Sequence, residues 1–265
     1  MNRRPFLLSL LAAACPALAA AAQKKSLADP LLLGVDHALV GAGLAAAFPR
    51  ALGRGPRVGA RLGAGSTAGT LAALEQGDVD ASMTTAAEIE NRLVKQGLAH
   101  DRRVVARGDV VLVGPVTGKG RKATDPAGLL GGRVAAAALM KVAQSGAAFV
   151  APPAGSGTNL AEVSLWGAAA VAPAAPWYVK APAGTDPLAH AAARGAYTLV
   201  DRGLWLRRPQ KGLAVVVEGD PRMATEVVLL RAFRVNHPAA KLFGQWVGGP
   251  NGRRVAGSQR GWRAA

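Results

Sequence analysis

The stretch STAGTLAALEQGDVDASMTTAAEIENRLVKQG, residues 66–97, holds two segments of helical period on either side of a short mixed run. The first segment is rich in Ala and Leu and ends at Gly77, and the second is amphipathic and ends at Gly97. Glycine commonly ends a helix because it accepts the left-handed backbone conformation found there. The run between them closes with Thr84 and Thr85, which we expect at the end of a strand. The stretch therefore predicts a helix, a strand and a second helix in succession.

The same alternation continues on both sides of this stretch. Apolar or β-branched runs predict strands at residues 31–35, 57–63, 109–115 and 212–218. Helical patterns occupy residues 41–53, where Pro49 bends or ends the helix, and residues 133–146, with a closing helix pair at 239–258. Strands that alternate with helices predict an α/β fold with largely parallel strands.

The first 22 residues, MNRRPFLLSLLAAACPALAAAA, have the pattern of a secretory signal peptide. Arg3 and Arg4 precede an apolar run from Phe6 to Ala14, and small residues follow. We expect an exported, periplasmic protein. Cys15 leaves lipoprotein anchoring as an alternative; if cleavage falls after it, the mature chain has no cysteine and forms no disulfide.

The chain carries a formal net charge of +16, which attracts anions. Its Lys and Arg residues are scattered, only 5% of its residues are aromatic, and it has no recognition-helix or aromatic-basic signature. These features argue against nucleic acid as a partner. We interpret most of the charge as solvated surface.

Several segments resemble catalytic or phosphate-binding motifs but do not match them. GPVTGKG, residues 114–120, is one residue too short for a phosphate-binding P-loop and lacks the Ser or Thr that follows its Lys. GAGSTAG, residues 63–69, lacks the glycines that flank a nucleophilic Ser. The four histidines have no metal-ligand spacing. We therefore predict no enzyme activity, no cofactor and no metal site.

Small polar residues at predicted strand ends form the candidate ligand-binding site. The candidates are Asp36, His37, Ser66, Thr67, Thr84, Thr85, Ser156, Gly157 and Thr158. Each Ser/Thr group precedes a predicted helix, whose N–H donors and dipole favour an anion. The competing interpretation is that the Ser and Thr residues are ordinary N-caps, that Asp36 caps a helix and that His37 is exposed.

Several motifs resemble, in order, those of the tungstate-binding proteins of bacterial ABC transporters. They are GDVDASMTTAAEIENRLVKQG, DVVLVGP, FVAPPAGSGTNLAEVSLW, WYV, RGAYTLVDRGLWL, VEGDP and FGQWVGGPNGRRVA, within residues 31–256. The resemblance implies a two-lobed periplasmic-binding-protein-like (class II) fold with two hinge crossovers. It also implies a monomer that holds a tungstate- or molybdate-like oxyanion, or another small ligand, between its lobes and delivers it to an ABC permease in the inner membrane.

The chain differs from this family at the residues that bind the ligand. The family's first strand ends in threonines and a serine that bond the oxyanion, whereas this chain has LGVDHALVG there, so that Asp36 brings a negative charge towards an anion. Pro152 stands in place of the family's arginine, and Asn159 in place of its usual histidine. The GSGT turn, residues 155–158, retains only the backbone part of an oxyanion site.

From the resemblance we expect lobe 1 to hold residues 30–113 and 216–265, and lobe 2 to hold residues 114–215. The expected function is capture of tungstate or a related oxyanion for a permease. Two alternatives stay open: a binding protein for a different small ligand, and a sensor or partner module without a transport role. Stabilisation of the folded state by a ligand separates them.

Overall fold

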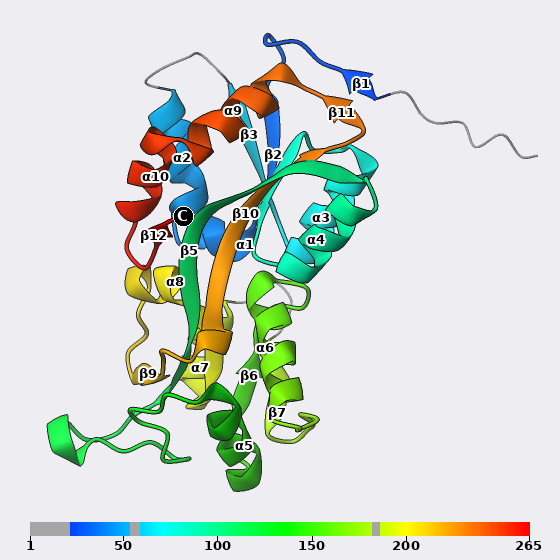
Figure 1. Cartoon of the computed structure of the whole chain (residues 1–265). Helices are drawn as coiled ribbons and strands as arrows, with labels where there is room; N and C mark the ends of the chain where they lie inside the picture. The colour runs from blue at the N-terminus through cyan, green and yellow to red at the C-terminus, as the bar shows by residue number, and fades with distance from the viewer. Residues whose placement is uncertain (1–21, 54–58, 182–185) are drawn as a thin grey trace, which may run out of the picture.

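A single long strand, β5 (Ala99–Pro115), runs through both lobes of this α/β protein (Figure 1). The computed structural model describes residues 22–53, 59–181 and 186–265. Cys15 and nearly all of the predicted signal peptide lie outside the described residues. The first part of β5 pairs with β10 (Ala224–Ala232) in lobe 1, and its second part pairs with β8 (Thr198–Asp201) and β9 (Leu213–Val217) in lobe 2.

Lobe 1 is built on a mixed sheet in the order β12-β5-β10-β4-β2-β3. Its parallel strands are β2 (Leu31–Asp36), β3 (Ala60–Gly65) and β4 (Ala81–Thr84), and β10 is antiparallel to β4 and β5. The edge strand β12 spans Arg263–Ala264, and β1 (Gln23–Lys24) and β11 (Val235–Asn236) form a separate two-stranded parallel sheet.

Helices cover both faces of the lobe 1 sheet and bury two apolar clusters. One face carries α1 (His37–Gly41), α2 (Leu44–Leu52), α9 (Pro238–Gly248) and α10 (Pro250–Gly257), packed through side chains such as Phe48 and Phe243. The other face carries α3 (Thr67–Gln76) and α4 (Ala87–Lys95), packed through Leu71, Leu74 and Leu93.

Lobe 2 joins the end of β5 and its neighbours β8 and β9 to the parallel pair β6 (Phe149–Ala151) and β7 (Tyr178–Lys180). A bridge between Phe149 and Tyr197 links the pair to the β8 segment. The covering helices are α5 (Ala135–Ser145) and α6 (Gly157–Ala168) around one cluster, and α7 (Pro187–Arg194) and α8 (Arg202–Arg207) around another. Two short 3-10 turns are η1 (Gly120–Lys122) and η2 (Pro221–Met223).

The two lobes have separate apolar cores, and the chain passes between them twice. The lobe 1 clusters end at Ala106 and resume at Val227, whereas the lobe 2 clusters begin at Val110 and end at Met223. The sequence-based boundaries at 113/114 and 215/216 stay a prediction; the apolar clusters change between residues 106 and 110 and between residues 223 and 227. At the first crossing β5 continues unbroken from one sheet into the next, so no turn or loop marks the boundary there.

Two local expectations need correction or refinement. The strand expected at residues 109–115 begins ten residues earlier, because the charged run after Ala99 pairs with β10 rather than forming a loop. Helix α2 contains Pro49 and continues to Leu52. Within the described residues, no helix combines the length and the apolar character needed to cross a bilayer.

Candidate functional site

The carboxylate of Asp36 lies where the two lobes meet, held by donors from both. Asp36 is the last residue of β2 and is 1% exposed. Its Oδ1 accepts from the Ala38 N–H at 2.7 Å, and its Oδ2 accepts from the Thr67 hydroxyl at 2.5 Å and from the Gly157 N–H at 3.1 Å. Ala38 and Thr67 belong to lobe 1 and Gly157 begins α6 in lobe 2. An anionic group therefore joins the two lobes.

Direct contacts close the cleft around this carboxylate. The Ala68 N–H of α3 donates to the Gly155 carbonyl of lobe 2 at 3.0 Å. Gly157 packs so closely that a Cβ added to it would lie 1.9 Å from the Thr85 Oγ1. Only a residue without a side chain fits between the lobes at this point. In this conformation the lobes are in contact through backbone and small side chains.

The first turn of α6 presents the lobe 2 donors because the local sequence caps the helix. The Ser156 hydroxyl accepts from the Asn159 N–H at 3.1 Å, as an N-cap does. The preceding Gly155 has a φ of 72°, which turns the chain into the helix. The Gly157 N–H is thereby left free to point at Asp36, and the positive end of the helix dipole lies behind it. This arrangement suits an anion at the helix N-terminus.

A second carboxylate, Asp201, also contacts the first turn of α6. It ends β8, is 3% exposed and accepts from the Thr158 hydroxyl through Oδ2 at 3.1 Å. Burial is the main reason why the pKa of Asp201 is raised from 3.8 to about 7, and the nearby charge of Asp36 raises it further. Asp201 therefore holds a proton for part of the time near neutral pH.

The structure brings most of the sequence-predicted residues together and leaves others aside. Five line the closed cleft: Asp36, Thr67, Thr85, Gly157 and Thr158. The Ser66 and Ser156 hydroxyls cap their own helices, accepting from Gly69 N at 3.1 Å and from Asn159 N. The two turns face each other, because a Cβ on Gly155 would lie 3.6 Å from the Ser66 Oγ.

Two of the predicted residues have other surroundings. The Thr84 hydroxyl donates to the buried Glu90 at 2.9 Å, and burial raises the pKa of that glutamic acid. The Thr84 side chain therefore lies in the interior of lobe 1. The His37 side chain is exposed, as the competing interpretation of this pair expected, whereas Asp36 is both a helix cap and a cleft residue.

The positions that depart from the resembling family take structural roles. Pro152 follows β6 and is buried. The Asn159 side chain accepts from the Gly155 N–H at 3.0 Å and donates to Glu162 at 2.9 Å. Glu162 also accepts from the Trp166 indole at 2.8 Å and from the Tyr178 hydroxyl, and its pKa is raised chiefly by burial. Asn159 thus fixes the glycine turn that aims the α6 N–H groups.

Asp201 is the candidate site residue that the sequence analysis did not predict. It stands in TLVDRG, where an acid ends a strand and a helix follows, the same local pattern as Asp36 in LLLGVDH. That shared pattern was the available signal. The pattern did not single out Asp201, because a second acid beside an anion site is unexpected on charge alone.

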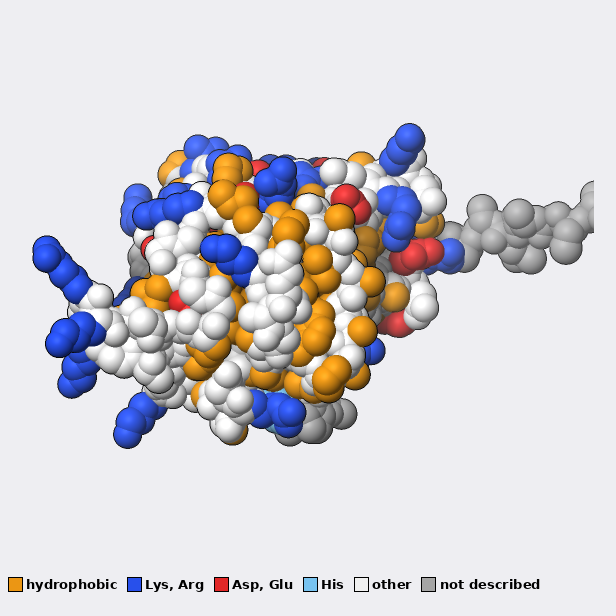
Figure 2. Space-filling view, turned by 90° about the horizontal axis from the view of Figure 1, so that it is seen from below, with side chains coloured by type: hydrophobic (Ala, Val, Ile, Leu, Met, Phe, Trp, Pro, Cys, Tyr) orange, Lys and Arg blue, Asp and Glu red, His pale blue; other side chains and the backbone are white. Residues whose placement is uncertain are grey.

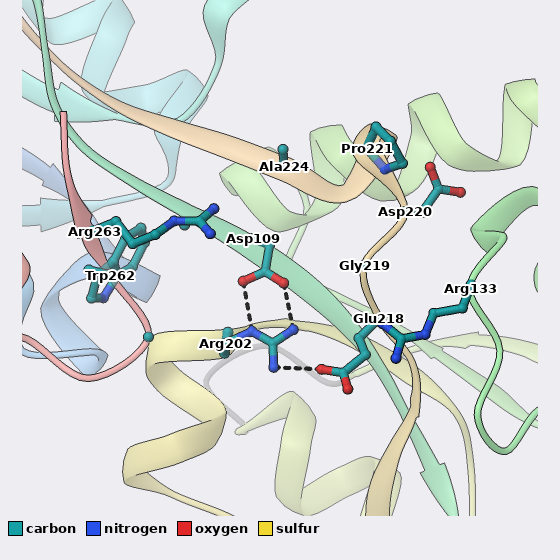
Figure 3. Close-up of a pocket in the computed structure, with 12 residues that line it drawn as sticks. Asp109, Arg133, Arg202, Glu218, Gly219, Asp220, Pro221, Ala224, Trp262 and Arg263 are labelled. Atoms are coloured by element: carbon teal, nitrogen blue, oxygen red, sulfur yellow. Dashed lines mark hydrogen bonds and ion pairs between the residues drawn. The ribbon is translucent and has the colours of Figure 1, made fainter.

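A separate hollow of about 600 Å³ lies at the hinge, the hinge pocket (Figure 3). Arg202 crosses it: two of its guanidinium nitrogens donate to Asp109 at 2.7 and 2.6 Å, and a third lies 2.7 Å from Glu218. Asp109 belongs to the first crossing and Glu218 to the second. None of the predicted site residues lines the hinge pocket, and Arg202 links β5 to the segment that follows β9.

On the face seen from the lobe 2 end, the basic side chains are spread out and do not form one patch (Figure 2). Viewed from the lobe 2 end, Lys and Arg side chains project around the rim and few acids are visible (Figure 2). In the part of the chain that the structure describes, no three His, Cys, Asp or Glu residues gather in a way that could hold a metal ion.

Comparison with known proteins assigns the chain to a family. Residues 45–247 match the family model described as a PBP superfamily domain. A Haloferax volcanii protein assigned as an ABC transporter anion-binding protein is 42% identical over 142 residues, 52% of this chain and 40% of the relative. The tungstate-binding protein TupA of Peptoclostridium acidaminophilum is 28% identical over 181 residues, 65% of this chain and 61% of the relative. The matches thus cover less than two thirds of either relative.

Solved structures of tungstate-binding proteins share the fold. The tungstate ABC transporter protein from Geobacter sulfurreducens has a TM-score of 0.73 and 29% identity, over 86% of this chain and 97% of that one. TupA from Desulfovibrio alaskensis G20 has a TM-score of 0.71 and 26% identity, over 89% of this chain and 99% of that one.

Proposed function

Because the chain belongs to the PBP superfamily, we propose that it is the solute-binding protein of an ABC transporter and captures an oxyanion in the cleft between its lobes. The relatives that support this proposal are named as anion- or tungstate-binding proteins. The signal-peptide pattern supports a periplasmic location for the mature protein, from which it would deliver its ligand to a membrane permease. No catalytic step is part of this role.

The observation that carries the proposal is the position of the Asp36 carboxylate. It is a small anion bound by a hydroxyl and two backbone N–H groups, one of them at the N-terminus of α6. The same donors bind an oxyanion when Asp36 moves aside, because they recognise negatively charged oxygen and not a particular residue. In this proposal the Asp36 carboxylate occupies the ligand's place in the free protein and competes with the ligand for the same donors.

The site is tested by titration calorimetry with tungstate, molybdate, sulfate and phosphate on the wild type and on Thr67→Val. Loss of one hydroxyl donor to an anion is expected to weaken binding about tenfold or more. Ser164→Ala, an exposed change on the same helix α6, is the matched control and should bind like the wild type. Equal binding by Thr67→Val would place the ligand elsewhere.

The closed, self-occupied cleft also favours a second candidate: a binding-fold protein that serves as a sensor or partner module. In that case Asp36 permanently replaces the solute. A ligand that binds only the folded state raises its melting temperature. A flat thermal-shift profile over oxyanions, metal ions and small organic acids would favour this second role.

A further inference from the structure

The change of pairing partner along β5 places the first crossing at a single peptide bond. Asp109 is the last residue of β5 that pairs with β10 of lobe 1, where it lies opposite Ala224. Val110 is the first that pairs with β8 of lobe 2, where it lies opposite Asp201. A rotation of one lobe against the other therefore changes the backbone dihedral angles next to the bond between residues 109 and 110.

The side chain of Arg202 reaches across this bond from lobe 2. Arg202 begins α8 and donates through two nitrogens to the Asp109 carboxylate, at 2.7 and 2.6 Å (Figure 3). Two parallel hydrogen bonds between a guanidinium and a carboxylate depend on the direction of both groups. A rotation at the 109–110 bond turns the carboxylate relative to the guanidinium and misaligns these bonds. The pair is thus sensitive to the angle between the lobes.

The third nitrogen of Arg202 contacts its own lobe. It lies 2.7 Å from Glu218, and the Glu218 N–H donates to the Gly132 carbonyl of lobe 2 at 3.2 Å. Glu218 therefore moves with Arg202 when the lobes rotate, whereas Asp109 does not. The two carboxylates make contacts of similar length, but only the contact to Asp109 crosses the hinge.

The backbone at the start of α8 has little freedom to follow such a rotation. A Cβ on Gly203 would lie 2.3 Å from the Trp262 indole nitrogen, and a Cβ on Gly108 would lie 2.6 Å from the same ring. Trp262 belongs to the lobe 1 core, so lobe 1 packs directly against α8. Asp201, at the other end of this short segment, accepts from Thr158 in the cleft. Three consecutive residues therefore contact the cleft, the hinge and lobe 1.

We propose that Arg202 is a positioning residue that holds the lobes at their closed angle through Asp109, and so sets how often the free protein opens to admit a ligand. The two side chains are 26% and 22% exposed, so solvent screens the pair only in part. Loss of the pair should lower the ratio of closed to open molecules about three- to tenfold. The inference goes beyond the proposed function, because opening is a property of the protein without ligand.

A distance measurement between two spin labels in the ligand-free protein tests the proposal. Labels on Asn91→Cys of α4 and Ser164→Cys of α6, both exposed, report the separation of the lobes once Cys15 is replaced by serine. Arg202→Met and Asp109→Asn should each raise the population with the longer distance. The double variant should add nothing further, because both changes remove the same contact.

Two control variants separate this role from ordinary stabilisation by ion pairs. Glu218→Gln weakens a contact of equal length within lobe 2, and Arg208→Met removes the 2.8 Å ion pair with Asp186, also within lobe 2. Both should keep the wild-type distance distribution. Arg202→Lys keeps the charge but not the two parallel bonds, so it should open the protein to a smaller extent than Arg202→Met.

The outcomes separate this inference from the proposed function. Unchanged distances in Arg202→Met and Asp109→Asn would overturn the inference, and so would additive effects of the two changes. Equal opening in Glu218→Gln would also overturn it, because that contact does not cross the hinge. If Arg202→Met does not fold, Asp109→Asn and Arg202→Lys decide. A protein that opens as expected but binds no oxyanion supports the role of Arg202 and contradicts the proposed function.

Discussion

Replacement of Gly157 by alanine tests whether the cleft must close through this residue. The added Cβ would lie 1.9 Å from the Thr85 Oγ1 and 3.2 Å from the Thr85 Cβ, across the lobe boundary. Ordinary contact begins at 3.4 Å, so the closest pair falls short by 3.4 − 1.9 = 1.5 Å. The lobes must separate or Thr85 must rotate, and the bond from the Gly157 N–H to Asp36, now 3.1 Å, lengthens or breaks.

The expected cost falls on closure and not on folding. A hydrogen bond to a charged group contributes about 1.5–3 kcal/mol, which corresponds to a loss of one to two decades in ligand affinity. Alanine is a better helix former than glycine, so the stability of α6 itself should not fall. Small-angle scattering should show a larger radius of gyration, and calorimetry with phosphate or tungstate should show weaker binding.

Two further variants make the result specific. Gly157→Ala with Thr85→Ala removes the Oγ1 and leaves the Thr85 Cβ position at 3.2 Å as the nearest contact of that residue, so closure and affinity should largely return. Gly167→Ala on the same helix meets nothing within 4 Å and should behave as the wild type. If Gly157→Ala alone binds and scatters like the wild type, the cleft does not close at this contact and the reasoning is wrong.

Three other predictions concern stability. The pKa of Asp201 is about 7 in the folded protein against an ordinary 3.8, so its contribution to the free energy of unfolding is fully present below about pH 4 and is lost as the pH rises through 7. Between pH 5 and 8, the free energy of unfolding of the wild type in urea should fall by about 2–3 kcal/mol relative to that of Asp201→Asn. Parallel pH curves for the two proteins would contradict this. Gly203→Ala would place a Cβ 2.3 Å from the Trp262 indole nitrogen, so it should cost about 1–3 kcal/mol and expose the C-terminal segment to proteolysis, unlike Gly167→Ala. Tyr197→Phe removes a hydroxyl that donates to Asp125 and accepts from the Ala127 N–H at 2.9 Å, and should cost about 1–3 kcal/mol in thermal or urea unfolding; an unchanged midpoint would show that the loop at 125–130 does not depend on it.

The alternation of helical and strand patterns was enough to predict the α/β class. The motif order gave the two-lobed expectation, and the GSGT turn pointed to the α6 N-terminus. Strand β5 shows the limit: its first ten residues include four charged side chains besides His100 and do not resemble a strand, yet β10 pairs with them along their length. Pairing partners that are more than a hundred residues away leave no local pattern.

The sequence could predict those candidate residues whose position follows from the backbone at a helix start. It could not predict which partner each side chain contacts. Gly157 and Thr67 follow from helix starts at strand ends, which the sequence displays. Thr84 and Thr85 are neighbours of the same type, yet one bonds the buried Glu90 and the other faces Gly157. Their division depends on which side of β4 meets helix α4 and which meets lobe 2, and that is a property of the assembled lobes.

The most direct test of the account is a crystal structure of the protein with a bound oxyanion. We expect the anion between the lobes, with its oxygens on the Thr67 hydroxyl and the Gly157 N–H and with the Asp36 carboxylate displaced from them. The hinge pocket, lined in part by Arg133 and Arg263, is the rival location for an anion. An oxyanion bound there, with Asp36 still bonded to Thr67 and Gly157, would contradict the assignment of the cleft as the ligand site.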